Sequence, residues 1–261
     1  MSKKRIVLKN HKGGVGKTTL SLHIAIGLAL RNRRVLLIDT DPQGHISNQL
    51  DMAEFGGLYR LLVQQAEWRE VLRQPSPAAW CGMEATIGEL LVVSSNLETR
   101  AIPLMIDNPL VLRERLAELE GRFDAVVFDT SPTPSLLQNV VDLASDYALL
   151  PSKCEMLSLD GLKKTTNALS QQNAARQSYG IEPIELLGVI PTMYRDTNSN
   201  IYGRDLLEEH FGAGMVWDPI PLRTIWTDRE YARQSIFTYA PRSEAADEMT
   251  RVIERLLNYV A

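Results

Sequence analysis

The stretch Asn10-His11-Lys12-Gly13-Gly14-Val15-Gly16-Lys17-Thr18-Thr19 decides the fold of this chain. Its ending, Gly16-Lys17-Thr18, is that of a phosphate-binding loop. In such a loop backbone N–H groups surround the phosphates, the lysine meets the β- and γ-phosphates, and the hydroxyl meets Mg²⁺. Residues 5–9 before it are rich in β-forming residues, and residues 18–30 after it carry apolar side chains at helical spacing. A strand, a glycine loop and a helix in this order predict phosphate binding at a helix N-terminus.

A second lysine makes this loop a variant. The first glycine of the strict pattern would fall at His11, so the match is to the form in which Lys12 stands at the loop entrance. Lys12 lies too far back to duplicate the role of Lys17. It is more useful if it reaches across an interface to nucleotide held by another subunit. The loop therefore favours a nucleoside triphosphatase that works as a dimer.

The composition predicts one α/β domain over residues 1–261, with 44% hydrophobic and 23% charged residues. No apolar run approaches the roughly 20 residues of a membrane span, and the short N-terminus leaves no room for a signal peptide. Cys81 and Cys154 are far apart, so we expect reduced thiols and a cytoplasmic protein. A net charge of −4 and a pI near 5.7 argue against a wholly basic nucleic-acid binder, although a local basic patch stays open.

Short apolar runs alternate with helical patterns, which predicts a mostly parallel twisted sheet flanked by helices. Strands are expected at residues 5–9, 34–39, 90–93, 125–129, 147–150 and 186–190, and helices around 18–30, 58–72, 110–119, 158–177 and 243–259. Residues 74–77 are expected to form a surface loop.

Two of these strands end in aspartate, and ligands bind beyond the carboxyl ends of parallel strands. Asp129 is in the position that commonly meets Mg²⁺ through water, with a helix-capping role as the alternative. Asp41 follows the strand 34–39 and could position an attacking water, whereas Asp39 more simply orients the loop or the waters of the metal. An ordinary Asp-Pro turn is the alternative for this segment. His45 is interpreted as a polar loop residue without a role.

Together these segments resemble the ParA/MinD group of deviant P-loop ATPases, a SIMIBI-like fold, over nearly the whole chain. Residues 12–19 match the family loop, with Lys12 as its signature lysine, and residues 128–132 match its third motif. Residues 39–44, Asp-Thr-Asp-Pro-Gln-Gly, match the ParA form of the second motif rather than the MinD form. Residues 187–194 and 220–222 resemble the segments near the adenine base.

The resemblance implies specific site residues. Catalytic roles fall to Lys12, Lys17 and Asp41. The metal would be held by Thr18, Asp39 and Asp129. Nucleotide would contact the loop and the base segment, at Lys12, Gly13, Gly14, Val15, Gly16, Lys17, Thr18, Thr19, Pro191 and Met193.

The resemblance also implies a cycle. ATP and Mg²⁺ bind each monomer, and two monomers close into a sandwich dimer in which Lys12 touches the partner's phosphates. The ATP-bound homodimer binds double-stranded DNA without sequence preference and associates with the nucleoid. A ParB-like adaptor stimulates slow hydrolysis and releases the dimer, which segregates or positions a plasmid, a chromosome or other cargo. The chain begins at its first strand, without the N-terminal DNA-binding domain of members that repress their own operon, so we expect no repressor role.

The DNA contacts of the family are C-terminal basic residues, and here the match is poor. Leu222 and Ile225 occupy places where chromosomal relatives tend to carry arginine. The candidates that could replace them are Arg223, Arg229, Arg233, Lys163, Lys164, Arg195 and Arg204. Acidic residues lie among them, so several could instead form surface ion pairs of little energetic weight.

Two other classes of function stay open. A MinD-like membrane-surface switch needs a basic amphipathic helix, but residues 243–259 are patterned as a core helix and we expect no stable membrane association. A metabolic or iron–sulfur enzyme on the same fold needs a cysteine ligand set, which Cys81 and Cys154 do not make. A small-molecule ligase or kinase is disfavoured by Lys12 and the Pro-Gln-Gly segment. The nature of the cargo is not encoded in any motif of the chain.

Overall fold

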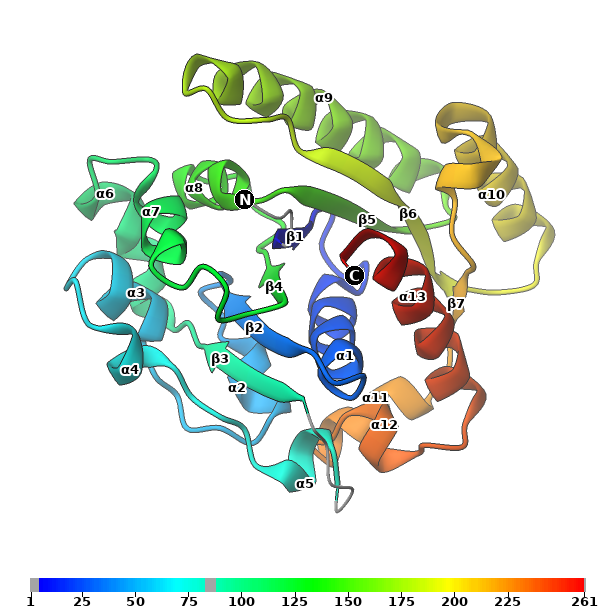
Figure 1. The fold of residues 1–261 in the computed structure, drawn as a ribbon. Helices are drawn as coiled ribbons and strands as arrows, with labels where there is room; N and C mark the ends of the chain where they lie inside the picture. The colour runs from blue at the N-terminus through cyan, green and yellow to red at the C-terminus, as the bar shows by residue number, and fades with distance from the viewer. Residues whose placement is uncertain (1–4, 83–87, 261) are drawn as a thin grey trace.

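The protein is organised around a seven-stranded sheet in which all neighbouring strands run parallel, as the computed structural model shows for residues 5–82 and 88–260 (Figure 1). The strand order is β3-β2-β4-β1-β5-β6-β7. The strands are β1 (Arg5–Leu8), β2 (Arg34–Asp39), β3 (Glu89–Val93), β4 (Ala125–Asp129), β5 (Tyr147–Lys153), β6 (Glu185–Tyr194) and β7 (Ile220–Pro221). The predicted parallel sheet flanked by helices is confirmed.

Helices cover both faces of this sheet (Figure 1). The α-helices are α1 (Lys17–Ala29), α2 (His45–Gln49), α3 (Gly57–Leu62), α4 (Trp68–Val71), α5 (Pro77–Trp80), α6 (Ile102–Met105), α7 (Val111–Ala117), α8 (Leu136–Ala144), α9 (Met156–Ser178), α10 (Asn198–Phe211), α11 (Ile225–Tyr231), α12 (Ile236–Tyr239) and α13 (Glu244–Val260). The described residues also contain two 3₁₀ turns, η1 (Leu97–Ala101) and η2 (Ala213–Met215). Helices α1, α5, α12 and α13 pack on one face, and α3, α4, α6, α7 and α8 pack on the other.

The central strands are apolar over most of their length because each face of the sheet has its own core. In β2, Val35 and Leu37 pack with α1 and α13, whereas Leu36 and Ile38 pack with the helices of the opposite face. Successive side chains of a strand point to opposite faces, so a sheet covered on both sides has no polar position to alternate with. This is why β1, β2 and β4 read as nearly unbroken apolar runs.

The sheet order brings the functional segments together. Strand β1 pairs with β4 on one side and β5 on the other, so the glycine loop that follows it leaves the middle of the sheet. Strands β2 and β4 pair in a register that places Asp39 opposite Asp129 at their carboxyl ends. Both predicted motif aspartates therefore meet beside the glycine loop.

Some elements differ from those predicted. The single helix expected over residues 58–72 is two short helices, α3 and α4, because Gln65 between them has a left-handed φ of 53° that no α-helix accommodates. Residues 74–77 include the start of α5 rather than only a loop, and Arg73 just before them forms an antiparallel bridge with Val92. Strands β5 and β6 extend further than the apolar runs, to Lys153 and Tyr194. In the part of the chain that the structure describes, no helix is long and apolar enough to cross a membrane.

Candidate nucleotide-binding site

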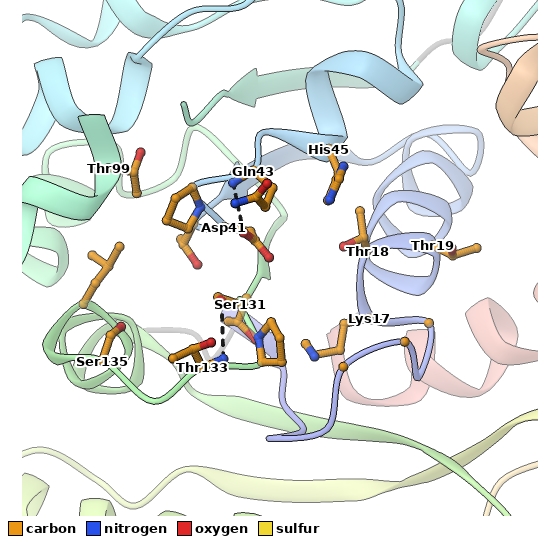
Figure 2. Close-up of a pocket in the computed structure, with 18 of the residues that line it drawn as sticks. Lys17, Thr18, Thr19, Asp41, Gln43, His45, Thr99, Ser131, Thr133 and Ser135 are labelled. Carbon is orange, nitrogen blue, oxygen red and sulfur yellow. Dashed lines mark hydrogen bonds between the residues drawn. The ribbon is translucent and has the colours of Figure 1, made fainter. Parts of the chain in front are cut away.

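A cavity of about 810 Å³ lies at the carboxyl edge of the sheet, where the three motif segments converge (Figure 2). The glycine loop and the start of α1 line one side, with Lys17 and Thr18. The second motif lines another side, with Asp41, Pro42 and Gln43. The segment after β4 closes it with Thr130, Ser131, Pro132 and Thr133. A pocket of this size accepts a ligand as large as a nucleotide.

The glycine loop is shaped by its backbone. Gly14 and Gly16 have φ angles of 66° and 84°, a left-handed conformation that side chains disfavour, and Gly16 directly precedes the first residue of α1. The carbonyl of Val15 accepts a hydrogen bond of 2.9 Å from the Thr192 hydroxyl of β6, while the Val15 side chain is buried. The loop is thus anchored to the sheet and presents the N-terminus of α1 to the cavity.

Lys17 lies inside the curl of the loop. Its Nζ donates hydrogen bonds to the carbonyls of Asn10 at 3.0 Å and Lys12 at 3.2 Å. Burial lowers the pKa of the Lys17 ammonium, while the carboxylates of Asp129 and Asp41 act in the opposite direction. The charge of Lys17 is therefore held at the phosphate end of the cavity by fixed acceptors.

Asn10 is a member of this site to which the motif pattern assigned no role. Its Nδ2 donates to the carbonyl of Pro151 at 2.8 Å, and its Oδ1 accepts the backbone N–H of Lys12 at 2.8 Å. The side chain is fully buried. Asn10 therefore connects the start of the loop to β5. The signal in the sequence that could have identified it is a polar residue soon after the apolar run 5–8.

Lys12 points away from the cavity that Lys17 serves. Its Nζ lies 3.2 Å from Oε2 of Glu155 and 2.9 Å from Oγ of Ser158, at the start of α9. Lys12 does not line the nucleotide cavity, and its side chain is 30% exposed. The two lysines of the loop are directed to different surroundings.

Asp129 ends β4 as a fully buried carboxylate. Neither oxygen has a hydrogen-bond partner of ordinary geometry among the described residues. Burial raises the pKa of Asp129 to about 6, and the hydroxyls of Thr18 and Ser21, which lie nearby, limit the rise. A buried carboxylate with free oxygens beside a threonine hydroxyl fits a hydrated Mg²⁺, which binds few protein groups and keeps several waters.

The described residues contain no gathering of three or more His, Cys, Asp or Glu side chains that could hold a metal ion by themselves. A metal at Thr18 and Asp129 would therefore take its other ligands from water and from the phosphates of a bound nucleotide. This is the arrangement that a P-loop site requires.

Asp39 and Asp41 have different surroundings although they are two residues apart. The Asp39 carboxylate is fully buried and accepts the backbone N–H of Asp41 at 3.0 Å and of Ile46 at 3.3 Å. Burial, followed by the charge of Asp129, raises the pKa of Asp39 well above its ordinary value. Asp39 thus holds the loop, and its assignment to the metal stays a prediction.

The Asp41 side chain lines the cavity and accepts the N–H of Gln43 at 3.0 Å (Figure 2). The carbonyl of Asp41 accepts a hydrogen bond from the Ser95 hydroxyl. Gly44 completes the turn with a φ of 64°, and a Cβ there would lie 2.9 Å from the Ser95 carbonyl oxygen. The Pro-Gln-Gly turn is therefore fixed by its packing and holds Asp41 at the cavity.

A second cavity of about 180 Å³ adjoins the first; apolar side chains such as Ile220, Leu222 and Trp226 line it together with polar ones such as Thr19 and Arg223. Met193 lines both cavities, as expected of a residue near the base. Pro191 was expected there as well, but it lies buried in β6 opposite Ser152 and lines neither cavity. Two residues apart on a regular strand would share a face. Met193 has a left-handed φ of 51°, which breaks that alternation and gives the two residues different surroundings.

Several other cavity residues were not predicted. His45, Gln49 and Glu230 line it, as do Thr99 and Arg100 of η1 (Figure 2 labels His45 and Thr99). The segment after β3 lies at the same carboxyl edge as the motif loops, so its polar residues could have been proposed from the strand pattern alone. Glu230 is 181 positions from Gln49, its partner, and no local pattern connects the two.

The seven basic candidates for DNA contact differ in their exposure and their partners. Arg229 is 1% exposed and donates to Gln49, so its assignment to a surface patch was wrong. Three others form ion pairs: Arg223 with Glu244 and Glu248, Arg233 with Asp51, and Arg204 with Glu208. The exposed candidates without an ion pair in the described part of the chain are Lys163, Lys164 and Arg195.

Comparisons with known proteins agree with this geometry. Residues 3–179 match a protein family described as an AAA domain. The chromosome-partitioning ATPase Soj of Thermus thermophilus is 32% identical over 263 residues, which cover 97% of this chain and 95% of that protein. The similarity therefore extends over nearly the whole of both chains.

Solved structures share the fold. Apo McdA from Cyanothece has a TM-score of 0.81 at 18% identity, covering 97% of this chain and 99% of that one. Cobyrinic acid a,c-diamide synthase from Mycobacterium smegmatis, with a bound ATP analogue and magnesium, has a TM-score of 0.79 at 23% identity, covering 98% and 94%. At these identities the two structures establish a common architecture and nothing about the reaction.

Proposed function

The chain belongs to the ParA/MinD family of P-loop ATPases, and we propose that it is a ParA-type switch that dimerises with ATP and positions DNA or other cargo. It is an ATPase whose cofactors are ATP and Mg²⁺. The observation that carries the finer proposal is the opposite orientation of the two loop lysines. Lys17 is enclosed by the loop, and Lys12 is directed out of the cavity toward α9.

The residues of the cavity have different roles in phosphoryl transfer to water. Lys17 and the loop N–H groups bind the phosphates and stabilise the charge that develops on them. Asp41 orients the attacking water, while Asp39 keeps the Pro-Gln-Gly turn in place. Thr18 and Asp129 would hold Mg²⁺, which would supply positive charge to the phosphates when bound.

Dimerisation is the second part of the proposal. A lysine outside its own phosphate cavity can act on the nucleotide of a second copy that faces it. Lys12 has the length and partial exposure to do so once it leaves Glu155 and Ser158. The closed homodimer would then carry two nucleotides between its subunits.

The third part concerns partners and location. The relative is a chromosome-partitioning ATPase, which supports a partition role. As the family resemblance implies, the ATP-bound dimer would bind double-stranded DNA without sequence preference, on the nucleoid, and a ParB-like adaptor would stimulate its slow hydrolysis. The exposed bases Lys163, Lys164 and Arg195 are the surface positions that support DNA binding. Several such residues together are needed to neutralise phosphates.

The test is binding to nonspecific duplex DNA with no nucleotide, with ADP and with ATP–Mg²⁺, in a salt series. Asp41→Ala is used to prevent ATP turnover. The wild type with ADP is the control for the state that has not formed the ATP dimer. We expect binding only with ATP, weakening steeply with salt. If the ATP dimer forms but binds no DNA in any nucleotide state, the hypothesis that it binds the nucleoid is rejected. A membrane or protein surface would then be favoured as its binding surface.

A further inference from the structure

The nucleotide cavity and the smaller apolar cavity meet along a shared border. Four residues line both: Gly16, Thr19, Met193 and Glu230. A ligand that extends from one cavity into the other must pass Glu230. Glu230 is the acidic side chain among these four, and it comes from α11, far from the motif segments in sequence.

The two cavities differ in chemistry, and this orients the ligand. The larger one carries Lys17 and the loop N–H groups, which suit phosphates. The smaller one is lined by Ile220, Leu222 and Trp226, whose apolar surfaces suit a planar base, together with polar side chains such as Arg223 and Thr227. The sugar of a nucleotide that spans both cavities therefore lies at their border.

Glu230 is held in place at this border. Nε2 of Gln49 donates a hydrogen bond of 3.0 Å to Oε1 of Glu230, and Oε1 of Gln49 accepts one of 2.8 Å from Nη1 of Arg229. An arginine can only donate and a carboxylate can only accept, so these partners fix the orientation of the Gln49 amide. Gln49 and Arg229 are 6% and 1% exposed. The Glu230 side chain is thus held in place by the buried side chains of Gln49 and Arg229.

We propose that Glu230 accepts hydrogen bonds from the ribose hydroxyls of the bound nucleotide and makes the site selective for ribonucleotides. A carboxylate repels phosphates, so Glu230 is not a phosphate ligand. The groups of a nucleotide that a carboxylate can bind at this place are the 2′- and 3′-hydroxyls, which donate. The proposal rests on the ATP binding proposed above and specifies its sugar.

The same contact connects the sugar to the second motif. Gln49 is the last residue of α2, and α2 begins at His45, directly after the turn that holds Asp41. The Gln49 side chain therefore couples the position of Glu230 to the helix that follows this turn. A nucleotide without the sugar hydroxyls would leave that connection in place but give Glu230 no ligand.

The experiment measures equilibrium binding of ATP and 2′-deoxy-ATP, both with Mg²⁺, to the full chain and to its variants. The wild type is expected to bind ATP about tenfold more tightly than 2′-deoxy-ATP, the effect of one hydrogen bond to a charged group. Glu230→Ala is expected to bind the two nucleotides equally, because its loss of affinity is about tenfold larger for ATP than for 2′-deoxy-ATP, which retains only the 3′-hydroxyl. Asp228→Ala removes the same charge from the same helix at an exposed position outside both cavities, and is expected to keep the preference.

Glu230→Gln, which conserves side-chain shape, is a further variant and is expected to reduce the preference as well. A loss in Glu230→Ala that is equal for both nucleotides would overturn the proposal, because it would show a structural role. Equal wild-type affinities for ATP and 2′-deoxy-ATP would also overturn it while leaving the ATPase intact. Absence of any ATP binding by the wild type would instead reject the proposed function itself.

Discussion

At the scale of single residues, the site separates neighbouring carboxylates by their surroundings. Asp39 accepts two backbone N–H groups and is fully buried, whereas Asp41 lines the cavity and is fixed by one N–H. Two acidic residues so close in sequence could have shared a role. Their different hydrogen bonds indicate that Asp39 stabilises the loop, whereas Asp41 can face the γ-phosphate in the proposed complex.

Asp41→Ala is expected to lower ATP turnover by about 10²- to 10³-fold, because the attacking water loses the group that positions it. ATP binding should persist, so the variant should accumulate as an ATP-bound dimer. Phosphate release under saturating ATP measures turnover, and Asp51→Ala, at an exposed position after α2, is the control. Wild-type turnover by Asp41→Ala would remove Asp41 from the mechanism.

His23 gives the stability of the protein a pH dependence. Its Nε2 accepts the backbone N–H of Ile236 at 3.0 Å and its Nδ1 lies 2.6 Å from the Thr19 carbonyl, so the folded state needs the neutral ring. Burial, followed by the charge of Arg229, lowers the pKa of His23 well below 6.5. Below pH 6.5 His23 becomes protonated in the unfolded chain but stays neutral in the folded chain. The free energy of unfolding therefore decreases as the pH falls.

The expected loss is up to about 1.4 kcal/mol for each pH unit below 6.5. Urea unfolding of the wild type and of His23→Gln at pH 7.5 and 5.5 measures it, since the other titrating groups are common to both proteins. The free energy of unfolding should fall more steeply with acid in the wild type. Equal slopes for the two proteins would show that His23 does not titrate in this range.

At the scale of helices and strands, the sequence predicts elements that have a clear apolar pattern. Strands β1, β2 and β4 are buried on both faces and were predicted within a residue of their ends. Helix α10 was not predicted, because only Gly203 and Leu207 of its 14 residues are buried and no apolar stripe marks it. Its one local signal is Thr197, whose side chain caps the helix by accepting the N–H of Asn200.

In the candidate site, too, only the residues that belong to a local sequence pattern could be predicted. The loop residues 13–19 and the strand-end aspartates could be predicted, because their chemistry is local in sequence. Gln49, Arg229 and Glu230 could not, because their contact joins α2 to α11 across 181 positions. The assignment of roles to the motif residues, and of residues 1–261 to one domain, stays a prediction.

Gly203 is where α10 packs closely on the chain just after β5. A Cβ at this position would lie 2.5 Å from the carbonyl oxygen of Cys154, a backbone atom that cannot move aside cheaply. Alanine favours a helix over glycine by about 1 kcal/mol, yet Gly203→Ala is expected to destabilise the protein by about 1–3 kcal/mol. Chemical unfolding measures this, and Gly214→Ala, which has open space around it, is the control. A stabilised Gly203→Ala would show that α10 shifts freely.

At the scale of the whole molecule, the proposed switch depends on a contact between two copies. Lys12→Ala should leave ATP binding by the monomer within about twofold of the wild type, because Lys12 does not line the cavity. It should abolish ATP-dependent dimerisation, measured by light scattering with Asp41→Ala in the background. Lys163→Ala, an exposed lysine of α9, is the matched control. A dimer that forms unchanged in Lys12→Ala would exclude this lysine from the interface.

DNA binding belongs to the same scale. Reversing the charge of Lys163 and Lys164 together should weaken binding of the ATP dimer to DNA by about tenfold or more, and should lower the salt slope by about one unit for each phosphate no longer neutralised. Arg233→Glu should have a smaller effect, because Arg233 is paired with Asp51. Fluorescence anisotropy in a salt series measures both. A larger effect at Arg233 would place the DNA surface beside α11 instead.

The central position of β1 has a consequence for synthesis on the ribosome. This strand is translated well before its partners, because β4 begins at Ala125 and β5 begins at Tyr147. Until both β4 and β5 have left the exit tunnel, β1 lacks one or both of its neighbours, so the glycine loop is not fully supported by the sheet. Long-range parallel pairing of this kind is slow and exposes apolar strands meanwhile. The ATP site therefore cannot be complete before β4 and β5 have been translated, and until then chaperones have an opportunity to act on the exposed strands.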